Sequence, residues 1–266
     1  SCESAEEQAA FDVYDANNIN PLYGFFVARA GLGASESMRS KLAEYNDPRL
    51  SRAFITKQGA SGKEQAPGTA DNAVYAPNGS PEQGTSKYGT SLFMYSISAP
   101  TLLLSYHELK FLEAEALCRL GRDAKSALKD AVVAGLLNAE NSSSVSRKEL
   151  GKTLINPASS ITDTEAESYF DNTIEAKYTA EPLKTTMIQK YFALWGASGE
   201  ATESYNDVRR MKGLGENFIE LKNPNSFPLR CPYGNSDTTT NAEVKAAYGN
   251  GQYVYSENVW WAGGSR

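Results

Sequence analysis

The residue types that most often carry out chemistry are scarce in this sequence. His107 is the only histidine, so a Ser-His-Asp or Cys-His arrangement would have to use it. It stands between Ser105 and Glu108, whose S-x-x-E spacing is typical of a capping box at the start of a helix. We therefore predict that His107 lies exposed on a first helical turn. One histidine and three dispersed cysteines also exclude a zinc site of the His/Cys kind.

The acidic residues offer no better catalytic pattern. Glu113 and Glu115 lie two positions apart on a predicted helix and should face different directions. A glycosidase pair of carboxylates is set by folding, and spacing alone neither reveals nor excludes it. The stretch "NSDTTTN" (235–241) could supply oxygen ligands to calcium, but it lacks the EF-hand pattern. No phosphate-binding glycine motif follows a plausible strand. These residues predict no cofactor, with a structural calcium as the open alternative.

Composition restricts the class of protein further. The chain has 266 residues, a formal net charge of −6 and a sequence pI near 5.1. With no run of Lys or Arg to form a basic face, nucleic acid is not an expected partner. There is no apolar run of 18 residues, and the first ten residues, "SCESAEEQAA", lack the apolar core of a signal peptide. Cys118 lies in an apolar helical pattern and is expected to be a buried small hydrophobe.

A helical hairpin is the clearest predicted element. One helix spans 105–121 and ends at Gly121, and a second begins after Asp123 and runs through "AKSALKDAVVAGLL" (124–137). The predicted buried stripe of the first helix is Tyr106, Leu109, Leu112, Ala116 and Leu120, and that of the second is Ala124, Leu128, Ala131 and Leu136. The motif A-x-A-L-x-x-L-G-R followed by A-L-x-x-A resembles a tetratricopeptide unit.

Two further helices are predicted at 182–196 and 200–211. The first buries Leu183, Met187, Ile188, Tyr191, Phe192 and Trp195, with Lys184, Gln189 and Lys190 mainly on the other side. In the second, Arg209 and Arg210 lie near Asp207 and Glu203, which favours a structural ion-pair role over ligand contact.

Shorter elements complete the prediction. A capped helix starts near Thr162 or Thr164, and another helix spans about 241–248. The stretch 57–91 is rich in Gly, Ser, Pro and Ala, which predicts a long surface loop or a pair of short strands around "DNAVYAP". A strand is predicted at "QYVYSENVWW" (252–261).

Several stretches, taken in order, resemble the C-terminal half of the SusD/RagB family of nutrient-binding outer-membrane lipoproteins. The most specific are "NDPRL" (46–50), "SYHELKFLEAEA" (105–116), "QKYFALWG" (189–196) followed by "YNDVRR" (205–210), and "VWW" (259–261). "NINPLYGFF", "APTLLL", "FPLRCPYGNSDTTTN" and "NVWWAGG" extend the match over nearly the whole chain.

The resemblance implies a mainly α fold of tetratricopeptide-like helix pairs with a loop-rich face and few short strands. It implies one SusD-like domain over 1–266, the C-terminal portion of a larger family fold, with 57–91 as a surface loop within it. It implies non-catalytic binding of oligosaccharides or peptides on the outer face of a Bacteroidetes-type outer membrane, and delivery to a SusC-like TonB-dependent transporter. The family's lipid anchor would lie in a missing N-terminal part, so Cys2 is not expected to be the anchor. The chain would then be a fragment or an unusually short member.

A glycan site needs flat rings for stacking and nearby amide or carboxylate groups for the sugar hydroxyls. Rings on loops are better candidates than rings in helical stripes. The predicted ligand-binding residues are Tyr75, Tyr88, Tyr233, Trp260, Trp261, Asn72, Asn78 and Asp237. If 252–261 is a strand, one of the two tryptophans should pack inward.

Two other functions compete with nutrient binding. A helical-repeat scaffold or adhesin that binds peptide or protein outside import would need more repeats than the one clear unit and the 182–211 pair. A surface hydrolase with buried carboxylates would release reducing sugar from a polysaccharide.

Overall fold

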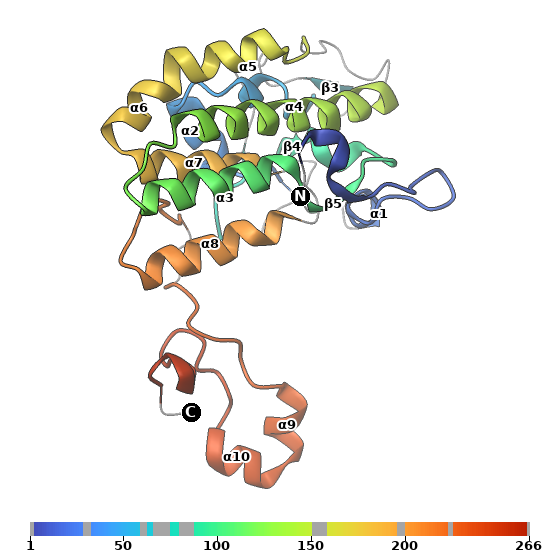
Figure 1. Ribbon diagram of the computed structural model, residues 1–266. Helices are drawn as coiled ribbons and strands as arrows, with labels where there is room; N and C mark the ends of the chain where they lie inside the picture. The colour runs from blue at the N-terminus through green and yellow to red at the C-terminus, as the bar shows by residue number, and fades with distance from the viewer. Residues whose placement is uncertain are drawn as a thin grey trace. The chain divides into compact units, whose positions relative to one another are not determined.

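The computed structural model describes residues 3–28, 33–58, 63–65, 75–79, 88–150, 159–195, 200–222 and 226–264. The chain forms two compact units, Ser1–Leu221 and Lys222–Arg266. Helices dominate the first unit (Figure 1). Its elements in chain order are η1 (Ala5–Glu7), β1 (Ala9–Phe11), α1 (Pro21–Ala28), α2 (Glu36–Glu44), η2 (Pro48–Ser51), β2 (Phe54–Gln58), β3 (Lys63–Gln65), β4 (Thr90–Ser91), η5 (Leu92–Tyr95), β5 (Thr101–Leu104), α3 (Tyr106–Arg119), α4 (Lys125–Leu150), α5 (Asp163–Tyr169), η7 (Phe170–Ile174), α6 (Glu175–Ala180), α7 (Pro182–Leu194) and α8 (Ala201–Gly213).

The predicted helical hairpin is confirmed as α3 and α4, which pack against each other. The Ser105 hydroxyl accepts a hydrogen bond from the Glu108 amide and caps α3. Gly121 takes a positive φ of 68° directly after the helix, a conformation that favours glycine. The predicted buried stripe of α4 is confirmed, and the helix continues to Leu150.

The predicted buried stripe of α3 is wrong. The helix buries His107, Glu108, Phe111, Ala114 and Glu115 instead. Leu112 and Leu120, which were expected inside, are 42% and 67% exposed. Periodicity cannot choose between two apolar rows on one helix, and packing on α4 and α7 selects the row that also carries charge.

Helix α7 is buried on most of its surface. Its apolar stripe is confirmed by Met187 and Phe192, but Gln189 and Lys190 are also buried, which corrects their predicted placement on the outer side. The helix packs against α3, α4, α6 and α8, so its polar side chains need partners inside the protein. The ammonium of Lys190 lies 2.8 Å from Asp207 Oδ2 on α8.

The core lies between these helices and α2. Its fully buried large side chains include Leu42, Phe111, Leu128, Leu136, Phe170, Ile174 and Phe192. Trp195 follows α7 and has its ring centroid 4.9 Å from Phe54 and 5.1 Å from Phe93, so aromatic contacts join the helices to β2 and η5. A Cβ at Gly135 would lie 2.9 Å from the Cβ of Ala193, which shows how closely α4 approaches α7.

The helix predicted near Thr162 is confirmed as α5, which Thr162 caps through the amide of Glu165. It continues through the π-helical segment η7 into α6. The predicted helix at 200–211 is confirmed as α8.

The strands are few and short, as expected. Antiparallel β1 and β5 form one two-stranded sheet, and β2 lies between β3 and β4 in a second antiparallel sheet. Part of the stretch 57–91 therefore belongs to strands. Ala76 is buried and bridges to Ser35 at the start of α2, whereas Asn72 lies outside the described residues.

The second unit contains α9 (Asn235–Thr240), α10 (Ala242–Tyr248) and the 3-10 turn η9 (Trp260–Ala262). Helix α10 confirms the helix predicted at 241–248, and Asn241 caps it. The strand predicted at 252–261 is wrong, because this segment forms a turn at 254–256 followed by η9.

None of the helices in the described ranges combines the length and apolar content that crossing a membrane requires.

Candidate functional site

Of the ligand residues predicted in the first unit, the described ones, Tyr75, Asn78 and Tyr88, lie near the start of α2. Residues 75–79 are held there because the Ala34 carbonyl accepts from the Ala76 amide at 2.8 Å. Asn78 Oδ1 accepts from the Ser35 hydroxyl at 2.9 Å. Tyr88 is only 6% exposed, so its ring offers little surface for stacking a sugar.

Tyr75 is half-buried and its ring is already in contact with protein groups. Its centroid lies 5.3 Å from that of Phe54 in an edge-to-face contact, and the Arg39 guanidinium lies 5.5 Å from it. Burial raises the pKa of the Tyr75 hydroxyl to about 12, with Glu36 adding to the rise and Arg39 opposing it. The hydroxyl is therefore neutral at physiological pH and could bond a sugar hydroxyl at its rim.

In the second unit, Tyr233 stacks on Tyr248 with centroids 4.4 Å apart, and the Arg230 guanidinium lies 4.5 Å from the Tyr233 ring. Asp237 is exposed on α9. The hydroxyls of Thr239 and Thr240, considered above as calcium ligands, donate to backbone carbonyls within the same helix. Within the described residues, no group of three or more His, Cys, Asp or Glu could hold a metal ion.

Trp260 and Trp261 present the largest open rings among the predicted residues. Each is 70% exposed, and their rings meet edge to face at 5.5 Å. The expectation that one packs inward is wrong, because they lie on η9 rather than on a strand. Successive residues of a 3-10 helix do not alternate between two opposite faces. Two adjacent indoles at a large angle offer a ligand two apolar planes.

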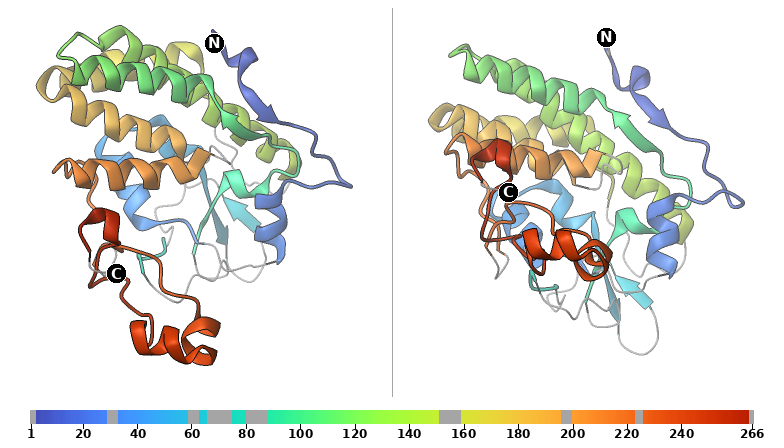
Figure 2. Two further views of the ribbon diagram at one scale, coloured as in Figure 1. Left: turned by 60° about the horizontal axis from the view of Figure 1, so that its bottom comes forward. Right: turned by 90° about the horizontal axis from the view of Figure 1, so that it is seen from below.

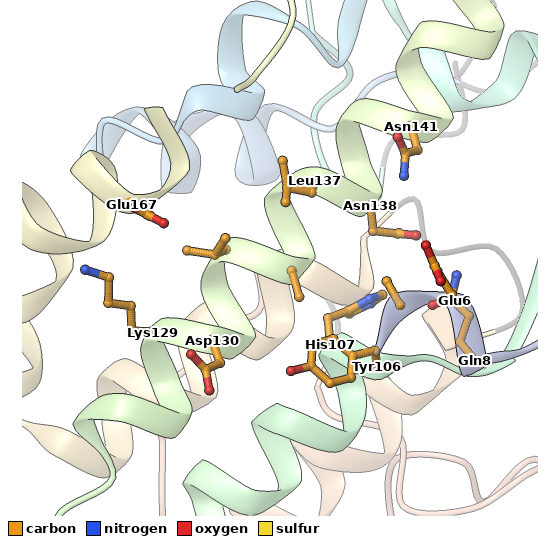
Figure 3. A pocket seen from close by; sticks show the side chains of 13 residues that line it. Glu6, Gln8, Tyr106, His107, Lys129, Asp130, Leu137, Asn138, Asn141 and Glu167 are labelled. Atoms are coloured by element: carbon orange, nitrogen blue, oxygen red, sulfur yellow. The ribbon is translucent and has the colours of Figure 1, made fainter. Parts of the chain in front are cut away.

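A pocket that sequence reasoning missed lies in the first unit. It has a volume of about 460 Å³ and is bordered by η1, the first turn of α3, α4 and α5. In Figure 3 the amides and carboxylates of several elements converge on it. Its polar lining comprises Glu6, Gln8, Tyr106, His107, Lys129, Asp130, Asn138, Asn141 and Glu167. Such groups suit the hydroxyls of a polyol, but they come from segments far apart in sequence and share no motif.

His107 lines this pocket and is only 1% exposed, so the prediction of an exposed histidine is wrong. It is buried because η1, α4 and Glu200, the residue before α8, cover the first turn of α3. Burial, aided by the charge of Arg49, lowers the pKa of His107 to about 4. The imidazole is therefore neutral at physiological pH.

Glu200 completes a buried acidic cluster with Glu108. One carboxylate oxygen of Glu200 accepts a hydrogen bond from the backbone amide of Ser105. In a complete capping box this amide would donate to the side chain of Glu108 instead. Burial, and after it the hydrogen bond to the Glu108 carboxyl, raises the pKa of Glu200 to about 7. The pair therefore retains a proton near neutral pH. The buried Nε2 of His107 and Oε2 of Glu200 lie 3.5 Å apart.

A second buried ionic cluster centres on Asp47 and Arg49. Arg49 Nε and Nη2 donate to the two Asp47 oxygens at 2.8 and 2.6 Å, and the Tyr169 hydroxyl donates to Asp47 at 3.2 Å. The NDPRL motif thus forms a structural pair that positions η2 against α5.

Arg210 has the structural role that the sequence favoured. Its guanidinium donates to both oxygens of buried Glu115 on α3 and to Asp207 Oδ1 at 2.7 Å. Arg119 also donates to Glu115. Burial opposes ionisation of Glu115, but the two arginines lower its pKa overall. Arg209 instead contacts Tyr205 at the surface.

The family model described as "Starch-binding associating with outer membrane" (SusD-like) matches residues 1–233. The chain is 66% identical to a SusD/RagB family protein from Bacteroides thetaiotaomicron VPI-5482, with a TM-score of 0.89 over 100% of this chain. A SusD homolog from Bacteroides fragilis NCTC 9343 is 20% identical over 96% of the chain, with a TM-score of 0.65, and shows the fold alone. No curated protein matches.

This chain belongs to the SusD-like family of starch-binding proteins that associate with the outer membrane. Its fold is the tetratricopeptide-like helical fold of that family, as expected. The chain spans 57% of the length of each of the two solved relatives named above. The family is described by what it binds rather than by a reaction.

Proposed function

We propose that this chain binds nutrient glycans without turning them over, on the extracellular face of the outer membrane, and contributes to their delivery to a partner TonB-dependent transporter. The observation that carries glycan binding is the match of residues 1–233 to a starch-binding family.

The proposed stacking surface is the pair Trp260 and Trp261. Sugars expose apolar C–H faces that pack on indole rings, and this pair is the most exposed aromatic surface of residues 226–264. Tyr233 and Asp237 of the second unit remain proposed glycan-binding residues. Tyr75 and Asn78 remain proposed glycan-binding residues of the first unit, taken by itself. Asn72 is a proposal from sequence alone, and Tyr88 would have to become uncovered to take part.

The test is a tryptophan-fluorescence titration with maltooligosaccharides, other oligosaccharides and short peptides. Trp195 is packed on Phe54 and Phe93, so a ligand-dependent change should come mainly from the two exposed indoles. We expect saturable binding of an oligosaccharide, weakened about tenfold or more by Trp261→Ala. Tyr205→Ala, which removes an exposed ring on α8, is the matched control.

Binding measurements on variants distinguish an error in the location of the site from an error in the proposed function. The Trp variants lose part of the fluorescence signal, so their affinity is measured by calorimetry. If the double variant Asn138→Ala, Asn141→Ala loses oligosaccharide binding and the Trp variants do not, the ligand binds in the pocket of the first unit. The proposed glycan-binding function would then stand, with a different site. No binding of any sugar or peptide by the wild-type chain, or by a longer form extended as in its relatives, would contradict the proposal and favour a scaffold.

A further inference from the structure

The lining of the pocket between η1, α3, α4 and α5 carries more negative than positive charge. Its volume of about 460 Å³ lies in the range of small-molecule sites. Among the described residues that line it, the carboxylates of Glu6, Asp130 and Glu167 stand against the ammonium of Lys129. That ammonium already lies 2.7 and 2.9 Å from the two oxygens of Asp171, which is not part of the lining. The pocket is therefore an acidic site.

The carboxylates of the pocket are accessible to a ligand. Within the described ranges, no side chain or backbone amide donates a hydrogen bond to the carboxylate of Glu6 or Glu167. Lys110 Nζ approaches Asp130 Oδ2 only to 3.9 Å and instead hydrogen-bonds to Glu113 Oε2 at 3.0 Å. Carboxylates that lack a close donor favour a cationic ligand, because charge-assisted hydrogen bonds are the stronger ones.

The histidine of the pocket does not offset this negative charge. His107 is 1% exposed, and its burial, aided by the charge of Arg49, lowers its pKa to about 4, so the imidazole is neutral at physiological pH. Figure 3 shows the imidazole pointing toward the side of the pocket that carries Glu6. Its Nε2 forms no hydrogen bond with any described residue. This end of the pocket therefore has a buried polar atom for which the described residues supply no donor.

The N-terminal segment is held firmly against this end. The Ser4 hydroxyl accepts a hydrogen bond from the Glu6 amide and so caps η1. Directly after η1, strand β1 pairs with β5, the strand that leads into α3 (Figure 2). Glu6 and Gln8 are thus positioned on the pocket by the elements on either side of them.

The middle of the pocket is aliphatic. Asp130 and Asn138 are about two turns apart on α4, which is about 12 Å along the helix axis. Between them lie the residues of the aliphatic strip, Val133, Ala134 and Leu137. Figure 3 shows Glu6 next to Asn138 and Asp130 at the opposite end of the pocket. Carboxylates therefore stand at both ends of an apolar strip.

This arrangement fits an alkyl chain with charged ends better than it fits a sugar. A sugar ring stacks on flat aromatic rings, and apart from His107 the described lining offers one such ring, Tyr106. We propose that the pocket binds a linear aliphatic polyamine, whose methylene chain lies on the aliphatic strip and whose terminal ammonium groups pair with Glu6 and Asp130. The burial of methylene groups and the two ion pairs then act on one ligand. The inference does not rest on the proposed glycan site, which lies in the other unit.

Calorimetric titration of the chain with spermidine tests the proposal. At pH 7 the amines of spermidine are protonated, because alkyl amines titrate near the pKa of lysine, about 10.4. We expect one saturable site that binds spermidine at least about tenfold more tightly than a neutral diol of similar chain length, and that weakens as salt is added. Trp261→Ala should leave this affinity unchanged, so the two proposed sites can be tested separately.

Variants locate the site. Asp130→Asn and Glu6→Gln should each weaken spermidine binding by about tenfold or more, because each removes one charged partner. Both residues are exposed, so the variants should keep their fold. Glu203→Gln, which removes a carboxylate of α8 that does not line the pocket, is the matched control and should bind as wild type does.

Three results would overturn the inference. The first is no binding of spermidine. The second is several weak sites that Glu203→Gln affects as much as Asp130→Asn, which would show nonspecific attraction to an acidic chain. The third is tighter binding of the diol or of an oligosaccharide than of spermidine, with loss of that binding in Asp130→Asn, which would assign the pocket to a polyol.

Discussion

Nε2 of His107 lies 3.5 Å from Oε2 of Glu200, and both side chains are almost completely buried. One comes from the first turn of α3 and the other stands at the start of α8. Arg49 and Glu108 are the charged groups that act on them. The two pKa values are displaced so that both groups prefer their neutral forms.

These displacements predict opposite effects of pH on stability. Glu200 titrates near 7 when folded and near 4.5 ordinarily, so the folded state holds the extra proton between these values. Its contribution to the free energy of unfolding therefore falls as pH rises through that window. His107 titrates near 4 when folded and 6.5 ordinarily, so its contribution rises as pH rises from 4 to 6.5.

Two variants separate these contributions. Relative to wild type, Glu200→Gln should gain stability as pH rises from 4.5 to 7, and His107→Gln should lose stability as pH rises from 4 to 6.5. Each slope is at most about 1.4 kcal/mol per pH unit. Urea unfolding at a series of pH values measures both. Curves parallel to wild type for both variants would show that the cluster does not titrate as described.

The two neighbouring arginines of α8 should differ in their effect on stability. Arg210→Ala removes the bidentate partner of buried Glu115 and should cost about 1–3 kcal/mol of unfolding free energy. Arg209→Ala loses a surface contact with Tyr205 and should stay within about 0.5 kcal/mol. Urea denaturation compares them. Unchanged stability of Arg210→Ala together with lost oligosaccharide binding would instead assign Arg210 to ligand contact.

The cluster around Asp47 should be sensitive to charge. Asp47→Asn leaves the guanidinium of Arg49 buried without its counter-charge and should destabilise the protein by about 3–5 kcal/mol. Tyr169→Phe removes one hydroxyl that donates to Asp47 and should cost about 1 kcal/mol. Thermal unfolding of the two variants measures the difference, and similar small losses would argue against a dominant ion pair.

Two glycines in helices should respond in opposite directions to alanine. Gly135→Ala places a Cβ 2.9 Å from that of Ala193 and should cost about 1–3 kcal/mol through overpacking. At Gly213 a Cβ meets nothing within 4 Å, so Gly213→Ala should stabilise by up to about 1 kcal/mol. A stabilised Gly135→Ala would show that α4 and α7 can separate at no cost.

The sequence correctly predicted those structural features that depend on residues close to one another in the chain. The cap at Ser105, the glycine after α3 and the short α10 all depend on residues within a few positions. The resemblance to the SusD-like family, carried by ordered motifs, predicted the helix-pair architecture.

The incorrect predictions of burial share one cause, which is contact between segments that are far apart in the sequence. The Ser105 amide meets a carboxylate 95 positions away, and Tyr169 meets Asp47 at a separation of 122. Such contacts bury polar residues on α3 and α7, where helical periodicity assigns polar residues to solvent. The same holds for the pocket, whose lining comes from separate helices.

The π-helical segment η7 marks a position at which the chain can lose one residue without disturbing its helices. Segments α5, η7 and α6 run on without a break from Asp163 to Ala180, and Phe170 and Ile174 at the ends of η7 are fully buried. A π turn holds a residue more than an α turn, so removing one residue here restores a regular helix. Elsewhere in a helix the same deletion rotates everything beyond it by about 100°. A gap in the alignment of relatives is therefore expected at exposed Asn172, and both flanking helices would keep their inner faces.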